Sequence, residues 1–171
     1  SSLAMNLAVH RLKNKPFNLD FVKEIIEQAA IVYNSKKSGI LELGGGVPKN
    51  TAQQTGPLLD QILRKDHGGQ DYIIQITDAR PDTGGLSGAT LQEGKSWGKV
   101  QDSHEDLITV YTDSTIAFPL LALYALSNED SREQKRIYKN LDKYYTTLQE
   151  SANKIPDKFA DILKKSDINL D

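Results

Sequence analysis

The chain contains no cysteine. This absence excludes disulfide bonds, thiolate metal sites and a cysteine nucleophile, and it is compatible with a reducing compartment. The sequence also lacks any apolar run close to the ~20 residues of a membrane-spanning helix, and its amino end has neither the apolar core nor the cleavage pattern of a secretory signal. From these absences we expect a cytoplasmic protein that has no membrane partner.

Neither sign of charge dominates the 171 residues, because 21 Lys and Arg stand against 23 Asp and Glu and leave a formal net charge of −2. Such a balance gives no general attraction to nucleic acid, so any charge selectivity must come from local clusters. The three histidines lie far apart and match no metal-ligand spacing, and the chain has neither a GxSxG nor a Walker sequence. We therefore expect neither a metal site nor a nucleic-acid partner.

The length suits a single domain, residues 1–171, with enough chain to bury a core. The sequence starts at Ser1 without an initiator methionine and passes directly into an apolar stretch. This start is typical of the interior of a longer or processed chain.

Strand and helix patterns alternate along the chain. Apolar residues at steps of three and four predict helices, and short apolar runs predict strands. A long glycine-containing segment at 77–99 is expected to be a loop, and the tail after Pro156 is expected to dock as a short helix. Strands alternating with helices predict an α/β fold with a parallel sheet flanked by helices. The expected helices cover 20–34, 48–63, 115–127 and 132–151, and the expected strands cover 40–43, 72–76 and 107–111.

A run of three glycines, Gly44 to Gly46, follows the first expected strand. Glycines allow the backbone to approach a ligand closely, and the helix that starts near Pro48 would direct its free N–H groups at an anion. These features suit a nucleotide phosphate. The spacing is not GxGxxG, and a plain tight turn explains the same residues.

Residues 77–88 place charged and small side chains in one long segment, with carboxylates at Asp78 and Asp82. One interpretation is a carboxylate-bearing wall that holds a cationic or hydroxylated ligand, since long loops in compact domains often carry function. The other is a solvated surface loop.

Lys99 lies close to Trp97, the one tryptophan of the chain. A large ring can desolvate a neighbouring ammonium, lower its pKa and free the amine to attack an electrophilic carbon. Trp97 could equally contact a substrate cation through its ring face. The alternative is an ordinary surface lysine, the common location of this residue type.

Four blocks in this order, LGGGVPKN, GGLSGAT, EGKSWGK and VYTDSTIAFPLL, resemble the carboxy-terminal half of the deoxyhypusine synthase family. They extend from Leu43 to Leu121, and the chain has no counterpart of the family's amino-terminal half. The resemblance implies a Rossmann-like NAD-binding fold. It also implies that residues 1–171 are the carboxy-terminal part of a longer or processed protein.

In that family, NAD oxidises spermidine, an aminobutyl group is carried as an imine on a lysine, and the group is transferred to a lysine of translation factor 5A. The resemblance implies that Lys99 is the catalytic lysine and that Trp97 and Glu93 line the polyamine tunnel. It implies NAD contacts at Gly45, Gly46, Asp78, Ala79, Gly84, Ser87, Thr112 and Asp113. An aspartate after a strand, such as Asp113, suits a ribose hydroxyl.

The chain departs from the eukaryotic pattern at several polyamine positions. Asn50 and Thr51 stand where those members have a histidine pair, and Leu86 replaces a polyamine-binding aspartate. Met5 stands where another tunnel aspartate lies. We expect Asn50 and Asp82 to complete the substrate site together with Trp97 and Glu93.

With these departures, the chain resembles the archaeal and bacterial deoxyhypusine synthase-like branch. The acceptor there could be a free amine, as in homospermidine synthesis from putrescine. A third possibility is a subunit that is active only with a partner chain that supplies the missing half. The family resemblance also implies a tetramer with active sites between subunits.

Overall fold

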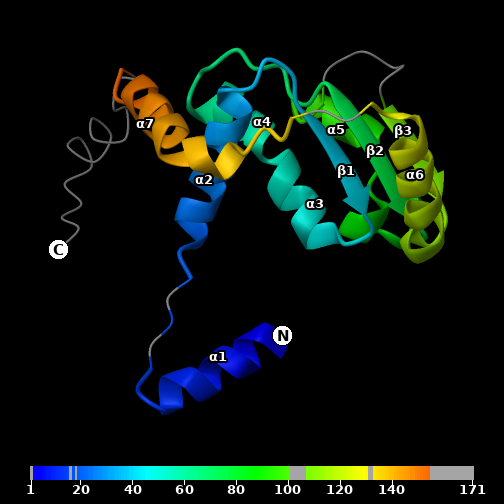
Figure 1. Ribbon diagram of the computed structural model, residues 1–171, viewed down its shortest axis with the longest axis horizontal. Helices are drawn as coiled ribbons and strands as arrows, with labels where there is room; N and C mark the ends of the chain where they lie inside the picture. The colour runs from blue at the N-terminus through cyan, green and yellow to red at the C-terminus, as the bar shows by residue number, and fades with distance from the viewer. Residues whose placement is uncertain (1, 16, 18, 101–106, 131–132, 155–171) are drawn as a thin grey trace.

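A short parallel sheet forms the centre of the molecule, as seen in a computed structural model that describes residues 2–15, 17, 19–100, 107–130 and 133–154 (Figure 1). Within these ranges the sheet has the order β1-β2-β3, and both strand pairs are parallel. The three expected strands are therefore confirmed, with small changes at their ends. They are β1 (Gly39–Leu43), β2 (Tyr72–Thr77) and β3 (Leu107–Tyr111).

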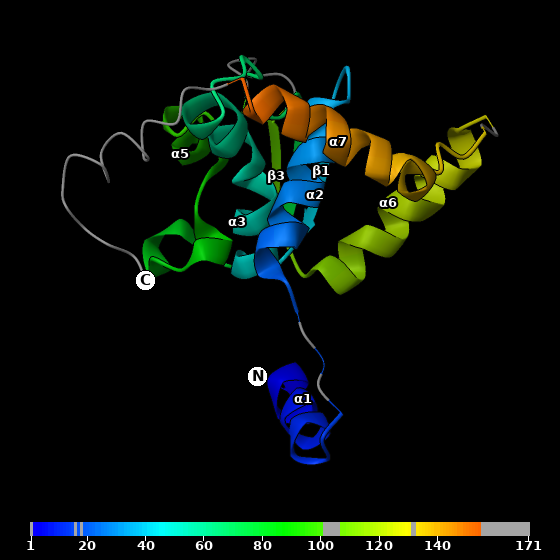
Figure 2. The same ribbon diagram turned by 90° about the vertical axis from the view of Figure 1, so that its left-hand side faces the viewer.

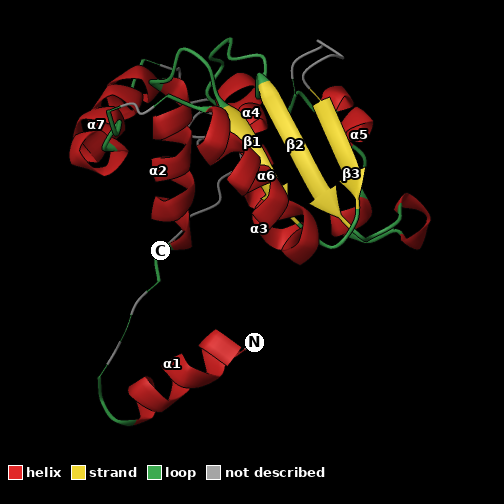
Figure 3. Cartoon of the chain, turned by 45° about the vertical axis from the view of Figure 1, so that its right-hand side comes forward, coloured by secondary structure: helices red, strands yellow, loops and turns green. Residues whose placement is uncertain are grey.

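Helices cover both faces of the sheet. On one face, Leu91 of α5 and Val100 pack against Ile73 of β2. On the other face, α6 lies against β2 (Figure 3). This arrangement confirms the expected α/β fold with a parallel sheet flanked by helices. The helices that follow β1 are α3 (Gly46–Gln53), α4 (Thr55–Pro57) and a π-helical turn (Leu58–Ile62), α5 (Leu91–Ser96) follows β2, and α6 (Ser114–Asn128) follows β3.

A second core forms beside β1, where α2 (Phe21–Tyr33) packs against α7 (Leu141–Ala152) (Figures 1 and 2). Its centre is fully or almost fully buried and consists of Ala29, Ala30, Leu59 and Leu148. The two small alanines let the helices approach closely. The start of α2 is fixed by Asp20, whose Oδ1 accepts a hydrogen bond from the Lys23 N–H, as an N-cap residue should. The predicted helix 20–34 is thus confirmed.

Two expected elements differ from the structure. Residues 77–99 are not a continuous loop, because they contain two 3-10 turns (Pro81–Thr83 and Leu86–Gly88) and the helix α5. Thr90 starts α5 by accepting a hydrogen bond from the Glu93 N–H, and the T-x-x-E spacing is the signature of such a start.

The helix predicted at 132–151 begins later than expected. Residues 133–136 are irregular and a 3-10 turn (Ile137–Asn140) precedes α7. Arg136 has a φ of +46°, and this left-handed backbone prevents an earlier helical start. The helix expected after Pro156 lies outside the described residues.

Much apolar surface is exposed. Helix α6 is apolar around its whole circumference, yet none of its residues is buried, and Leu126 is 82% exposed. The neighbouring sheet face exposes Leu41 and Ile108. At the amino end, α1 (Ser2–Leu12) lies apart from the rest of the chain (Figures 1 and 2). A helix that is apolar on every side is ordinarily buried, so this surface has the character of an interface.

No helix in the described ranges combines the length and the apolar character needed to cross a membrane.

Candidate active site

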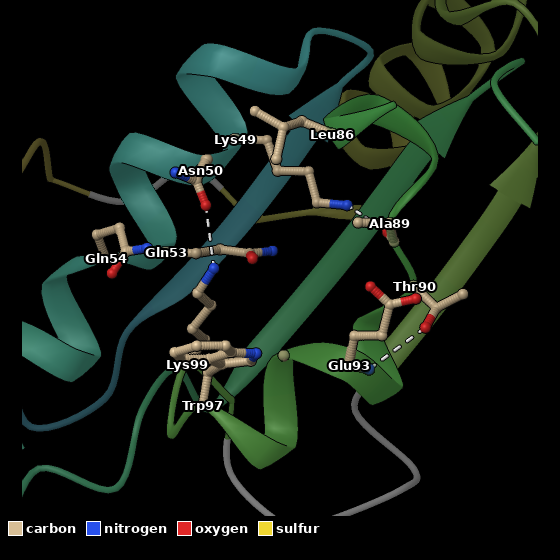
Figure 4. Close-up of a pocket in the computed structure, with 11 residues that line it drawn as sticks. Lys49, Asn50, Gln53, Gln54, Leu86, Ala89, Thr90, Glu93, Trp97 and Lys99 are labelled. Atoms are coloured by element: carbon tan, nitrogen blue, oxygen red, sulfur yellow. Dashed lines mark hydrogen bonds between the residues drawn. The ribbon is translucent and has the colours of Figure 1, made fainter. Parts of the chain in front are cut away.

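A pocket of about 270 Å³ opens between α3 and α5 (Figure 4). It brings together four residues that the sequence predicts for the catalytic and substrate sites: Lys99, Trp97, Glu93 and Asn50. It also contains Lys49 and Gln53 of α3, which were not predicted.

The Lys99 side chain is partly buried and points toward α3 (Figure 4). Its Nζ donates a hydrogen bond of 3.0 Å to Oδ1 of Asn50. The amide oxygen is neutral and orients the amine of Lys99 without neutralising its charge. A carboxylate at the same place would neutralise that charge. The side chain of Lys99 is therefore positioned inside the pocket by a group that leaves its chemistry free.

The backbone of Lys99 is held by close contacts with a second segment. Its N–H donates to the Gly94 carbonyl and its own carbonyl accepts from the Gln70 N–H, both at 3.0 Å. A Cβ built on Gly69 would lie 2.7 Å from the Lys99 carbonyl carbon and 2.6 Å from the Val100 nitrogen. Only a glycine at position 69 permits this approach, so Lys99 is fixed by a segment outside α5.

Trp97 and Glu93 form a more open wall of the pocket. The Trp97 side chain is 62% exposed, and its carbonyl accepts a hydrogen bond from Gln61 Nε2 at 3.0 Å. Glu93 is exposed on α5. The indole ring and the carboxylate are therefore both accessible to a ligand, and both attract cations.

Lys49 is only 6% exposed, and its Nζ donates to the Ala89 carbonyl. Burial is the main cause that lowers the pKa of Lys49, and the positive charge of Lys99 lowers it further. The negative charges of Glu42 and Glu93 act in the opposite direction. The sequence signal that could have identified Lys49 is its place in the first turns of the helix that follows the glycine run. At this place its side chain faces the sheet.

Glu42 lies beneath the pocket on β1 and is 4% exposed. Its Oε1 accepts a hydrogen bond from Nε2 of Gln53. Burial raises the pKa of Glu42, and this outweighs the Gln53 hydrogen bond and the positive charges of Lys49 and Lys99. Residues 40–43, with the sequence ILEL, predict an apolar strand. The carboxylate of Glu42 within this run was the signal of a buried polar group, and the prediction overlooked it.

The glycine turn after β1 lies at the carboxyl edge of the sheet. Gly44 and Gly45 have φ angles of +58° and +65°, which favour glycine, and a Cβ on Gly44 would meet no atom within 4 Å. Gly46 differs, because its Cβ would lie 2.6 Å from Cβ of Leu86. The missing side chain at Gly46 therefore admits the 3-10 turn, whereas the backbone at Gly44 is open.

The other residues expected to contact a cofactor also gather at this edge, since parallel strands end there together. Asp78 and Ala79 follow β2, and Thr112 and Asp113 follow β3. Hydrogen bonds from the side chain and backbone of Thr115 lower the pKa of Asp113, which starts α6. The remaining two residues expected to contact the cofactor, Gly84 and Ser87, lie in the segment after β2. Gly84 has a φ of +72°.

The three other residues discussed for polyamine binding, Asp82, Leu86 and Met5, lie in different surroundings. Asp82 is exposed and pairs with Arg80 at 3.0 Å, outside the pocket lining. Leu86 lines the pocket as an apolar side chain. Met5 lies on α1 and is 66% exposed.

Comparison with known proteins identifies relatives of this chain. The deoxyhypusine synthase family profile matches residues 1–125. Over 154 residues the chain is 46% identical to a deoxyhypusine synthase-like protein of Nostoc punctiforme, covering 87% of this chain and 40% of that protein. Over 137 residues it is 41% identical to a probable deoxyhypusine synthase 2 of Methanosarcina acetivorans, covering 80% of this chain and 39% of that protein. The chain thus spans about 40% of the length of these relatives.

The contact between Gly69 and Lys99 can be tested by substitution. Gly69→Ala combines a left-handed φ of +86° with a backbone clash, so the free energy of unfolding should fall by about 2 to 4 kcal/mol. Gly85→Ala is the matched control, because Gly85 has a φ of −79° and no atom near its Cβ position; its effect should stay within about 0.5 kcal/mol. Denaturant unfolding measures both values, and equal midpoints would show that the contact carries no constraint.

Proposed function

The chain belongs to the deoxyhypusine synthase family, and we propose that it provides the lysine-bearing part of an NAD-dependent transferase. The reaction moves an aminobutyl group from spermidine to an acceptor amine through an imine on Lys99. The observation that carries this proposal is the placement of Lys99. Its backbone is fixed by Gly69, and its amine lies in a pocket beside an exposed indole and a carboxylate.

The chemistry assigns one role to each side chain. NAD, when bound, accepts a hydride from the carbon beside the secondary amine of the donor and returns it to the product at the end. The Nζ of Lys99 attacks the oxidised carbon, the bond from that carbon to the diaminopropane nitrogen breaks, and an aminobutyl imine on Lys99 results. The acceptor amine then attacks the same carbon and releases Lys99.

Neighbouring residues position the reactants. Asn50 holds the amine of Lys99 at 3.0 Å. The Glu93 carboxylate attracts a terminal ammonium of the donor, and the face of Trp97 attracts a cationic or apolar part of its chain.

The carboxyl edge of the sheet fits a dinucleotide. The open backbone at Gly44 allows close approach of a pyrophosphate, which the start of α3 attracts. Ala79, Ser87 and Asp113 lie at the same edge, where dinucleotides bind in open α/β sheets. These residues would hold NAD beside the pocket that contains Lys99.

A second candidate is a homospermidine synthase-like transfer to a free amine. Two lysines, Lys49 and Lys99, line the pocket together with the carboxylate of Glu93. Leu86 adds an apolar wall, and Asp82 pairs with Arg80 instead of lining the pocket. This charge pattern favours amines that are shorter or less charged than a full polyamine. The acceptor is then putrescine instead of a lysine of translation factor 5A.

We also infer that a region equivalent to the rest of the relatives, or another copy of these residues, covers the exposed apolar surface of α6. The surface is large, and the relatives are more than twice as long as this chain. A partner region equivalent to the rest of the relatives, within a tetramer, would bury it. The active unit is thus expected to contain more than one copy of these residues.

Replacement of Lys99 tests the imine. The protein, with every chain that accompanies it, is incubated with NAD and spermidine, treated with borohydride and digested. The peptide that contains Lys99 should gain the mass of an aminobutyl group. Lys99→Ala should lose at least 95% of this capture, roughly 1.8 kcal/mol or more, because the other lysine of the pocket, Lys49, is buried and its Nζ donates to the Ala89 carbonyl. Lys36→Ala, an exposed control, should behave as the parent. An adduct on Lys49, or full capture in Lys99→Ala, would refute the assignment, whereas capture from a different amine would support the second candidate.

The assembly can be tested on α6. Leu123→Glu and Leu126→Glu introduce charges at positions that are 64% and 82% exposed in the chain by itself. If α6 is covered by a partner, each substitution should weaken assembly by roughly tenfold or more because a charge is buried unpaired. Sedimentation velocity measures the assembly, and Gln149→Glu on the exposed side of α7 is the control. A parent protein that sediments as a single chain would contradict the inference.

A further inference from the structure

Two buried polar residues lie side by side beneath the pocket. Glu42 of β1 and Gln75 of β2 are register partners in the parallel sheet, so their side chains project from the same face. They are 4% and 2% exposed. Neighbouring strands lie roughly 4.8 Å apart, which brings such side chains within hydrogen-bonding reach.

Each residue leaves one oxygen unsatisfied. Oε1 of Glu42 accepts from Gln53, and Nε2 of Gln75 donates to the Ser87 carbonyl at 3.0 Å. Oε2 of Glu42 and Oε1 of Gln75 are both buried and have no hydrogen-bond partner among the described residues. Buried unsatisfied acceptors are costly, and two adjacent ones are rare in a folded protein.

Both oxygens are acceptors, so they cannot bond to each other as a carboxylate and an amide. One proton on Oε2 of Glu42 would change this, because the acid would then donate to Oε1 of Gln75 and satisfy both atoms. We propose that Glu42 is a protonated positioning residue, whose proton links it to Gln75 beneath the active-site pocket.

The charged groups around Glu42 are compatible with a neutral acid. Lys49 approaches from α3, and Lys99 from the turn after α5; Glu93 of α5 interacts with Lys49. The ammonium of Lys49 donates to the Ala89 carbonyl. Burial is the largest influence on Glu42 and favours its uncharged form.

The proton would complete a chain of hydrogen bonds across the sheet. The chain runs from Gln53 in the pocket wall, through Glu42 and Gln75, to the carbonyl of Ser87. Oγ1 of Thr77 donates to the same carbonyl at 3.3 Å. One end therefore belongs to α3, which carries Asn50, and the other belongs to the 3-10 turn that carries Leu86. Glu42 would hold these two walls of the pocket at a fixed separation.

Infrared spectroscopy of the protein at neutral pH tests the protonation state directly. A protonated carboxyl group absorbs apart from carboxylates, and we expect such a band, shifted in heavy water, in the parent protein. Glu42→Gln should remove the band, and Glu93→Gln, which alters an exposed carboxylate of the same pocket, should leave it unchanged. A parent spectrum without this band, or a band that persists in Glu42→Gln, would overturn the assignment.

The pH dependence of unfolding gives a second measurement. A carboxyl group whose folded-state pKa is raised stabilises the fold fully below its unfolded pKa, and this contribution is lost as the pH rises through the folded value. The stability of the parent should therefore fall relative to that of Glu42→Gln as the pH rises from the acid range. Glu42→Gln should also be at least as stable as the parent at neutral pH, because its amide can donate to Gln75. A difference that does not change with pH would contradict a protonated Glu42.

Amide hydrogen exchange tests the positioning role. Glu42→Ala breaks the chain of hydrogen bonds, so the amides of residues 86–89 should exchange about tenfold faster, whereas Glu42→Gln should leave their rates within about twofold. Unchanged rates in Glu42→Ala would exclude the link between the two walls.

Activity provides a separate comparison that rests on the proposed function. Borohydride capture at Lys99 should remain within about twofold of the parent in Glu42→Gln and fall about tenfold in Glu42→Ala. Capture that is equal in both variants would exclude a positioning role in the reaction. If the parent captures nothing while its infrared band is present, the proposed function fails and the protonated Glu42 stands.

Discussion

The close backbone approach between Gly69 and Lys99 is the constraint on which the site depends. Lys99 follows a helix of only six residues, which is too short to fix a side chain by itself. Its position comes instead from hydrogen bonds to Gly94 and Gln70 and from the absence of a side chain at Gly69. The segment that contains Gly69 and Gln70 is joined to the segment that contains Lys99 by an isolated parallel bridge between Gln70 and Val100. The proposed nucleophile is thus held by two parts of the chain that are distant in sequence.

The sheet has two faces of opposite character near this lysine. Beneath the pocket it carries Glu42, Gln75 and Thr77, all almost fully buried. The opposite face carries Leu41, Ile108 and Val110, all substantially exposed. In an ordinary parallel α/β sheet both faces are covered by helices and are apolar. This difference between the faces fits both proposals made above, in which polar groups position the pocket on one face and a partner covers the other.

Much of the fold could be predicted from local patterns. Asp20 and the spacing of apolar residues predict α2, and the short apolar runs predict all three strands, since both signals depend only on neighbours in sequence. The late start of α7 could not be predicted, because the left-handed backbone at Arg136 reflects its surroundings. In the site, the resemblance of the EGKSWGK block predicts Lys99, Trp97 and Glu93 together. Lys49 and Glu42 were missed because their role depends on burial, which arises only when α3 packs on the sheet.

The backbone contacts of Lys99 with Gly69 and Gln70 have a consequence for how such a pocket could diversify. Trp97 and Glu93 are exposed on a short segment, whereas the backbone of Lys99 is also held by Gly69 and Gln70, which lie outside that segment. Substitutions of these two exposed side chains can therefore change the shape and charge that the pocket offers to a ligand while the contacts of Lys99 with Gly69 and Gln70 are kept. Natural variation can alter this wall of the pocket with little effect on the position of Lys99.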